Sequence, residues 1–77
     1  MTQDTDPTAL VRDIRARLGL TQEKFAARLG VTLPTINRWE NGRSKPSPLA
    51  MQNLWDLIVA MGDQGQDLLA RATMFKT

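Results

Sequence analysis

The 77-residue sequence contains no cysteine and no histidine. The lack of cysteine excludes disulfides, thiol redox chemistry and thiolate metal sites, and the lack of histidine excludes imidazole ligands and the commonest general base. The carboxylates show neither the spacing of a metal-binding loop nor the glycines of a phosphate-binding loop. These eight residues are Asp4, Asp6, Asp13, Glu23, Glu40, Asp56, Asp63 and Asp67. We therefore expect no enzymatic activity, no cofactor and no metal site.

Long apolar runs are also absent. The longest one covers five residues, 57–61, whereas a membrane-spanning helix needs about 20. The first ten residues hold no basic region followed by an apolar stretch, which argues against a secretory signal. A chain of this length has room for one hydrophobic core. We expect one small domain with no membrane partner and a cytoplasmic location.

Basic residues are concentrated in the middle of the chain. Residues 12–45 hold eight basic and three acidic side chains, a net charge of +5, whereas the rest of the chain carries −3. Such a distribution predicts a surface that attracts a polyanion. The alternative is an ordinary solvated face, because charge runs are often no more than that.

Capping residues divide the chain into five short helices and indicate no strand. Asp6 is the expected cap of the first helix and Pro7 its first residue, since proline lacks only an N–H that would be unpaired there. Hydroxyl side chains cap the next three helices, and glycines follow most helix ends. We predict helices at 7–18, 22–29, 33–40, 49–61 and 66–75, with 1–5 frayed. The chain is therefore predicted to be all-α.

Apolar side chains recur at helical spacing and predict one core. The predicted stripes comprise Val11, Ile14, Leu18, Phe25, Ala26, Leu29, Ile36, Trp39, Leu54, Leu57, Ile58 and Met61, with Leu10 beside the first stripe. We expect Trp39 to pack in the core rather than stack on a ligand, and Trp55 to lie at its edge. The last segment, 63–77, either adds a fifth core helix or forms a dimer interface, or both.

The second and third predicted helices are joined by residues 30–32 alone, which is the spacing of a helix-turn-helix. Two helices that cross so closely need a small residue at their contact, and Ala26 meets this need. They also need a residue that accepts a positive φ in the turn, which Gly30 provides. Ile36 and Trp39 would hold the third helix against the core. A helical hairpin that merely packs is the alternative.

The outward face of the third helix carries Leu33, Pro34, Asn37 and Arg38. Apolar residues exposed in a first turn are unfavourable without a partner. In a DNA major groove they would contact thymine methyl groups, and Arg38 would donate to N7 and O6 of guanine. This face therefore predicts contact with base edges.

Taken in order, these features resemble the Cro and phage-repressor-type helix-turn-helix domains, the XRE or lambda-repressor-like family. The resemblance covers about residues 8–60 and is carried by Arg15, 18–22, Phe25-Ala26, 29–31, 36–42 and Pro46. It implies a compact five-helix domain, with the helix-turn-helix formed by its second and third helices. It also implies sequence-specific binding of double-stranded DNA by a transcriptional regulator, which we expect to be a repressor.

Residue roles follow from the same resemblance. Residues matching the base-reading face are Leu33, Pro34, Asn37 and Arg38. Those matching phosphate contacts are Thr21, Gln22, Thr32, Thr35, Asn41, Arg43 and Lys45. Arg15 and Glu40 match a structural ion pair. Family members often have glutamine or serine in place of Leu33 and Pro34, so specificity here is expected to depend on Asn37, Arg38 and DNA shape.

The expected partner is a pseudo-palindromic DNA operator bound by a homodimer, because one such domain covers about half of a symmetric site. Residues 6–62 are predicted to form the DNA-binding domain and residues 63–77 the C-terminal helix. No small-molecule ligand is expected. The rival interpretation is an antitoxin or adaptor-type protein-interaction module, for which a toxin would be the partner, since residues 45–49 are similar to the connector of some helix-turn-helix antitoxins.

Overall fold

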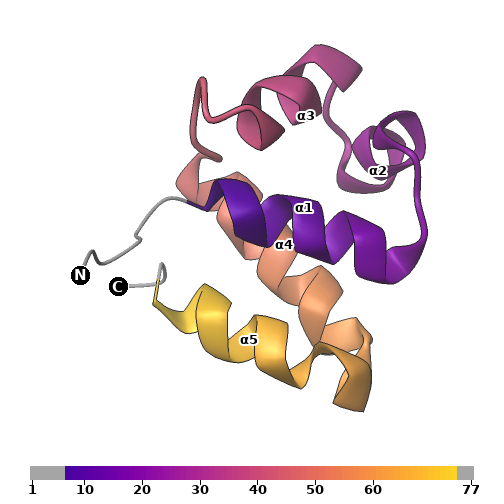
Figure 1. The fold of residues 1–77 in the computed structure, drawn as a ribbon, viewed down its shortest axis with the longest axis vertical. Helices are drawn as coiled ribbons and strands as arrows, with labels where there is room; N and C mark the ends of the chain where they lie inside the picture. The colour runs from indigo at the N-terminus through magenta and orange to yellow at the C-terminus, as the bar shows by residue number, and fades with distance from the viewer. Residues whose placement is uncertain (1–6, 75–77) are drawn as a thin grey trace.

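The computed structural model describes residues 7–74. Within that range the chain is helical, with no strand. The elements are α1 (Thr8–Leu18), α2 (Gln22–Leu29), α3 (Leu33–Glu40), α4 (Pro48–Ala60), the 3-10 helix η1 (Gly62–Gly65) and α5 (Gln66–Thr73). Helices α2 and α3 lie together at one end of the molecule and α5 at the other, with α1 and α4 between them (Figure 1). The predicted all-α, five-helix class is confirmed.

Helices α2 and α3 have the predicted bounds, because hydroxyl side chains cap both N-termini. Thr21 and Thr32 each accept a hydrogen bond from the backbone N–H three residues further on. Ser47 does the same at α4, where Pro48 occupies the first helical position. Each cap satisfies one of the N–H groups that a helix N-terminus leaves unpaired. Local chemistry is therefore sufficient to place these three starts.

Other boundaries differ from the prediction: α4 begins at Pro48, one residue early, and α5 ends at Thr73 instead of 75. Helix α1 begins at Thr8, and Pro7 is its N-cap residue, whose carbonyl accepts from the Val11 N–H at 2.9 Å. Helix α4 ends at Ala60, one residue early, because the left-handed Gly62 starts the 3-10 turn before α5. The predicted Asp6 cap, the frayed segment 1–5 and Phe75 lie outside the described residues.

The core agrees with the predicted stripes at most positions. Fully buried apolar residues are Leu10, Val11, Ile14, Phe25, Ala26, Ile36, Trp39, Leu54, Ile58, Leu68 and Ala72. Leu10 is fully buried rather than peripheral, because α1 packs against both α3 and α5 and so buries a wider stripe. Four residues expected inside are only partly buried against this cluster, namely Leu18, Leu29, Leu57 and Met61.

Helix α5 packs into the core through Leu68 and Ala72. Its outer side is attached to α1 by an ion pair at each end. Arg17 donates to both Asp67 carboxylate oxygens at 2.9 and 3.1 Å, and Arg71 donates to Asp13 at 2.7 Å. The structure thus contains the fifth core helix, while a dimer interface in residues 63–77 stays a prediction.

Candidate nucleic-acid interface

The turn between α2 and α3 holds the second helix of the pair against the core. Gly30 has φ +72°, and the Val31 N–H donates to the Ala26 carbonyl at 3.0 Å, which closes the C-terminus of α2. Ala26 is buried, as predicted. Ile36 and Trp39 lie in the core, so the core interpretation of Trp39 is confirmed. One face of α3 is therefore inside and the opposite face outside.

The outward face of α3 carries the four predicted base-contacting residues, Leu33, Pro34, Asn37 and Arg38, all of them exposed. Leu33 is 44% exposed, one of the few large apolar side chains at the surface of the described residues. The predicted edge residue Trp55 is half-buried and packs against the core from α4. The structure thus collects the base-reading candidates on one helix face.

Hydrogen bonds connect the polar side chains along this face. The Thr32 and Thr35 hydroxyls lie 2.9 Å apart, and Arg38 Nη2 donates to the Thr35 hydroxyl at 3.4 Å. At the other end, Asn41 Nδ2 donates to Asn37 Oδ1 at 3.1 Å. The polar side chains of α3 are therefore partly ordered before any ligand arrives.

The predicted phosphate-contacting residues lie at both ends of α3. Thr32 and Thr35 belong to its N-terminal turn, and Asn41, Arg43 and Lys45 follow its C-terminus. The Arg43 N–H donates to the Arg38 carbonyl at 2.9 Å, which ties this connector to the helix. Thr21 caps α2, and Gln22 opens it and lies beside the C-terminal end of α3, where it donates to Glu40. Thr35 and Gln22 are half-buried and the other five residues are exposed.

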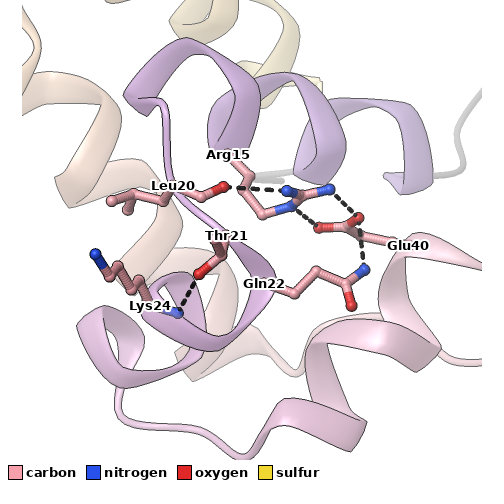
Figure 2. A network of polar contacts seen from close by, with 6 residues as sticks. All are labelled: Arg15, Leu20, Thr21, Gln22, Lys24 and Glu40. Carbon is pink, nitrogen blue, oxygen red and sulfur yellow. Dashed lines mark hydrogen bonds and ion pairs between the residues drawn. The ribbon is translucent and has the colours of Figure 1, made fainter.

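The predicted partners Arg15 and Glu40 form a bidentate ion pair (Figure 2). Arg15 Nε and Nη2 donate to the two Glu40 carboxylate oxygens at 2.7 and 2.9 Å. Arg15 Nη1 donates to the Leu20 carbonyl at 3.1 Å, and Gln22 Nε2 donates to Glu40 Oε1 at 3.0 Å. One guanidinium thereby joins α1, the turn before α2 and the end of α3.

Glu40 is charged although it is buried. Burial alone would raise its pKa, but the hydrogen bonds from Arg15 and Gln22, with the nearby positive charge of Arg15, outweigh that effect and lower the pKa. Every buried side-chain nitrogen and oxygen in residues 7–74 has a hydrogen-bond partner. The network is therefore fully satisfied, the condition under which a buried charge is tolerated.

Ion pairs engage two acids and two bases of the basic segment, so its net charge is unchanged. Of its three acids, Glu40 is internal and paired with Arg15, and Asp13 is paired with Arg71. The cations Arg38, Arg43 and Lys45 are exposed beside α3. The surface around α3 thus carries exposed positive charge.

Two features of this region were not predicted from the sequence. One is the hydrogen bond from Gln22 to Glu40, and the other is the hydrogen bond from Asn41 to Asn37. The spacing of four residues between the two asparagines is a signal that sequence reasoning could have used.

No acidic cluster able to hold a metal occurs among the described residues. No helix within 7–74 is long and apolar enough to span a membrane.

Two short helices joined by a glycine turn, with the second held by its apolar side and open on its polar side, define a helix-turn-helix domain. The helix-turn-helix family model matches residues 11–54, more than half of the chain. The chain belongs to this family, in its Cro and phage-repressor-type branch.

Two curated relatives show the same similarity. A protein named propionyl-CoA carboxylase regulator, from Cereibacter sphaeroides, is 49% identical over 41 residues, which cover 53% of this chain and 9% of that protein. A protein named uncharacterized HTH-type transcriptional regulator, from Methanothermobacter thermautotrophicus, is 55% identical over 38 residues, 49% of this chain and 55% of that protein. The chain thus spans about half of one relative and about a tenth of the other. No solved structure matches it.

Proposed function

We propose that this protein is a sequence-specific transcriptional regulator that inserts α3 into the major groove of double-stranded DNA and represses by occupying promoter DNA. The observation that carries the proposal is the two-sided construction of α3. Ile36 and Trp39 fix its inner face in the core, while residues 33, 34, 37 and 38 stand exposed on the other. An α-helix held in this way fits the major groove.

The base-contacting residues divide into polar and apolar groups. Arg38 donates to guanine N7 and O6, the commonest specific contact of its side-chain type. Asn37 contacts the neighbouring base edge, and Leu33 and Pro34 pack on thymine methyl groups. Leu33 and Pro34 form no side-chain hydrogen bonds with base edges, so DNA shape contributes the remaining specificity.

The phosphate contacts anchor α3 at both ends. Arg43 and Lys45 neutralise phosphates next to its C-terminus. Asn41 donates one amide hydrogen to Asn37 and has a second amide hydrogen for a phosphate. Gln22 gives one amide hydrogen to Glu40 at 3.0 Å and keeps the second for a phosphate. Thr21, Thr32 and Thr35 complete the polar positions that meet the backbone. These contacts position the domain and carry no sequence information themselves.

The site is expected to be pseudo-palindromic and bound by a homodimer, each subunit reading one half-site in the cytoplasm. Two recognition helices related by a two-fold axis meet successive major grooves about 34 Å apart, which fixes the half-site spacing. Residues 63–77 remain our candidate for the dimer contact. Leu69, half-buried on α5, and the exposed Met74 supply apolar area there.

The test is selection of bound fragments from random duplex DNA at about 150 mM salt, where nonspecific contacts are weakened. We expect enrichment of a palindromic site by the wild type. Arg38→Ala should lose about 1 to 3 kcal/mol of binding free energy and relax preference at one base pair. No enrichment by the folded wild type would contradict the proposal and favour an antitoxin or adaptor, which capture of a toxin through residues 63–77 would then test.

A further inference from the structure

Helix α4 is strongly apolar, yet much of it faces solvent. Only one of its 13 residues, Asp56, is charged, and only Leu54 and Ile58 are fully buried. Leu49 is 72% exposed, more than any other large apolar side chain in the described part of the chain, and Val59 is 53% exposed. A helix with apolar residues on all sides is normally enclosed by protein. Helix α4 is enclosed on one side only.

Four exposed residues share one face of α4, because they are spaced by four, three and four positions. They are Leu49, Asn53, Asp56 and Ala60. The spacing is the same when counted from either end, so two antiparallel copies of α4 stay in register along the whole face. Leu49 of one copy then lies opposite Ala60 of the other, and Asn53 lies opposite Asp56.

A groove between α2 and α4 lies at the Ala60 end of this face. It has a volume of about 450 Å³ and is bounded by residues 27–30 of α2 and the second half of α4. Small or apolar residues form much of its lining, namely Ala27, Leu29, Gly30, Leu57 and Ala60. In the antiparallel arrangement the Leu49 side chain of a second copy enters this groove. The face is therefore complementary to itself in shape, with a large apolar side chain at one end and a groove at the other.

Polar groups on the same face also complement one another. Arg28 lines the groove together with Asn53 and Asp56. Within the described part of the chain, Arg28 forms no ion pair and the Asn53 side chain no hydrogen bond. Asp56 accepts from Gln52 at 3.0 Å through Oδ1. In the antiparallel arrangement, Asp56 of one copy receives its further donors from Asn53 and Arg28 of the other, as charge-assisted hydrogen bonds.

We propose that a second copy of this chain docks on α4 in antiparallel orientation, with Leu49 of each copy in the α2–α4 groove of the other. A two-fold contact requires that one surface carry both members of every pair. This face does so for Leu49 and the groove and for Asp56 and Arg28, which favours a second copy over a different protein.

The contact goes beyond the proposed function, because none of the predicted DNA-contacting residues belongs to this face. It is also separate from residues 63–77, and it needs no DNA. One helix face per copy is small for a protein interface, so we expect a reversible dimer whose population depends on concentration.

Sedimentation equilibrium of the full chain without DNA, over a series of protein concentrations, tests the contact. We expect the average mass of the wild type to rise from 8.6 kDa toward twice that value. Leu49→Ser should raise the dimer dissociation constant at least about tenfold, because each dimer loses two buried leucine contacts. Leu33→Ser is the matched control: it removes an apolar side chain that is 44% exposed on α3 and should leave the dissociation constant unchanged.

Exchanging charges tests the polar pairs. Arg28→Asp and Asp56→Arg each set like charges opposite one another across the two-fold axis, so each single variant should dimerise more weakly. The double variant restores opposite charges and should recover most of the lost affinity, which a merely damaged monomer would not do. No recovery, with both single variants folded by circular dichroism, would overturn the polar pairing and with it the register.

Crosslinking tests the register directly, because the chain has no cysteine of its own. Leu49→Cys combined with Ala60→Cys should give a disulfide-linked dimer on mild oxidation, since each position lies opposite the other in the partner. Within one copy the two positions are about 16 Å apart along the helix, well beyond the span of a disulfide. Either substitution alone should give little covalent dimer, because the antiparallel register keeps the two copies of one position equally far apart.

The outcomes separate this proposal from the proposed function. A folded wild type that stays at 8.6 kDa at every concentration would overturn it. So would a dimer that Met74→Ser dissociates and Leu49→Ser does not, which would place the contact on α5, and so would crosslinking by Leu49→Cys alone that equals crosslinking by the pair. In each case, a palindromic site enriched in the DNA selection would leave the proposed function standing. Failure of that selection would not affect the contact on α4, because the free protein forms it.

Discussion

Arg15 and Glu40 are 25 residues apart in the sequence, and in the folded protein the Arg15 guanidinium donates a hydrogen bond to each carboxylate oxygen of Glu40. The Glu40 side chain is 4% exposed and that of Arg15 27%. Gln22 donates to the same carboxylate. Because a buried carboxylate is tolerated only in a suitable geometry, this contact relates the orientation of α3 to those of α1 and α2.

Removing the cation should therefore be costly. We expect Arg15→Met to lower the free energy of unfolding by about 3 kcal/mol, the lower end of the range for breaking a buried pair, since Arg15 keeps partial exposure. The control is Arg17→Met, which breaks the exposed pair with Asp67 and should cost much less, because solvent screens an exposed pair. Urea unfolding measures both values. Equal losses would show that burial of Glu40 does not matter.

The same ion pair should make stability depend on pH. Folding lowers the pKa of Glu40, so its contribution to stability is complete above the unfolded pKa and is lost as the pH falls through the folded pKa. We expect the stability difference between the wild type and Glu40→Gln to be constant above about pH 5 and to shrink below the ordinary glutamate value of about 4.3. Urea unfolding from pH 3 to pH 7, about the range over which carboxylates titrate, measures it. A difference that grows on acidification would have the wrong sign.

The contact between α2 and α3 should not accept a larger side chain at Ala26. Ala26→Leu should cost about 1 to 3 kcal/mol of stability, because overpacking forces the two helices apart. Ala27→Leu is the matched control on the exposed side of α2 and should change stability by less than about 0.5 kcal/mol. Thermal melting that does not distinguish the two variants would contradict the described packing of α2 on α3.

The junction of α4 and α5 should depend on Gly65 for steric reasons. A Cβ there would lie 2.7 Å from the Ile58 carbonyl oxygen and 3.1 Å from Ile58 Cγ2, so Gly65→Ala must displace one helix. We expect a loss of about 1 to 3 kcal/mol. The exposed neighbour Gln64 offers the control Gln64→Ala, expected to be nearly neutral. Chemical denaturation measures the change in the free energy of unfolding for both variants.

Arg43 should act on all DNA sequences alike. If it contacts a phosphate, Arg43→Ala weakens specific and nonspecific binding together and reduces the slope of log affinity against log salt by about one unit. Fluorescence anisotropy titrations over a series of salt concentrations measure that slope. An unchanged slope would remove Arg43 from the phosphate contacts.

Much of the fold was predictable because its signals are local. Thr21 and Thr32 cap helices through N–H groups three residues away, and Gly30 follows the end of α2 with the positive φ that its place requires. The α2 and α3 bounds were therefore predicted correctly, and with them the exposure of the α3 face. Leu10 was misplaced because its burial depends on α5, which is distant in the sequence.

The candidate site was predictable as a set of residues and not as a network. The Arg15–Glu40 pair came from a family resemblance, since nothing local relates two residues in different helices. The hydrogen bond between Asn41 and Asn37 and the hydrogen bond from Gln22 to Glu40 were not predicted. Such hydrogen bonds depend on where the side chains lie in the folded state, which residue type does not specify.

The sequence by itself determined the five helices, the glycine turn between α2 and α3 and the residues that α3 exposes, because caps, periodic apolar positions and positive-φ glycines act over a few residues. The tertiary structure decided the docking of α5 on α1, the close approach at Gly65 and the burial of a charged Glu40. Each of these depends on atoms from different helices, which come together only after the helices have packed.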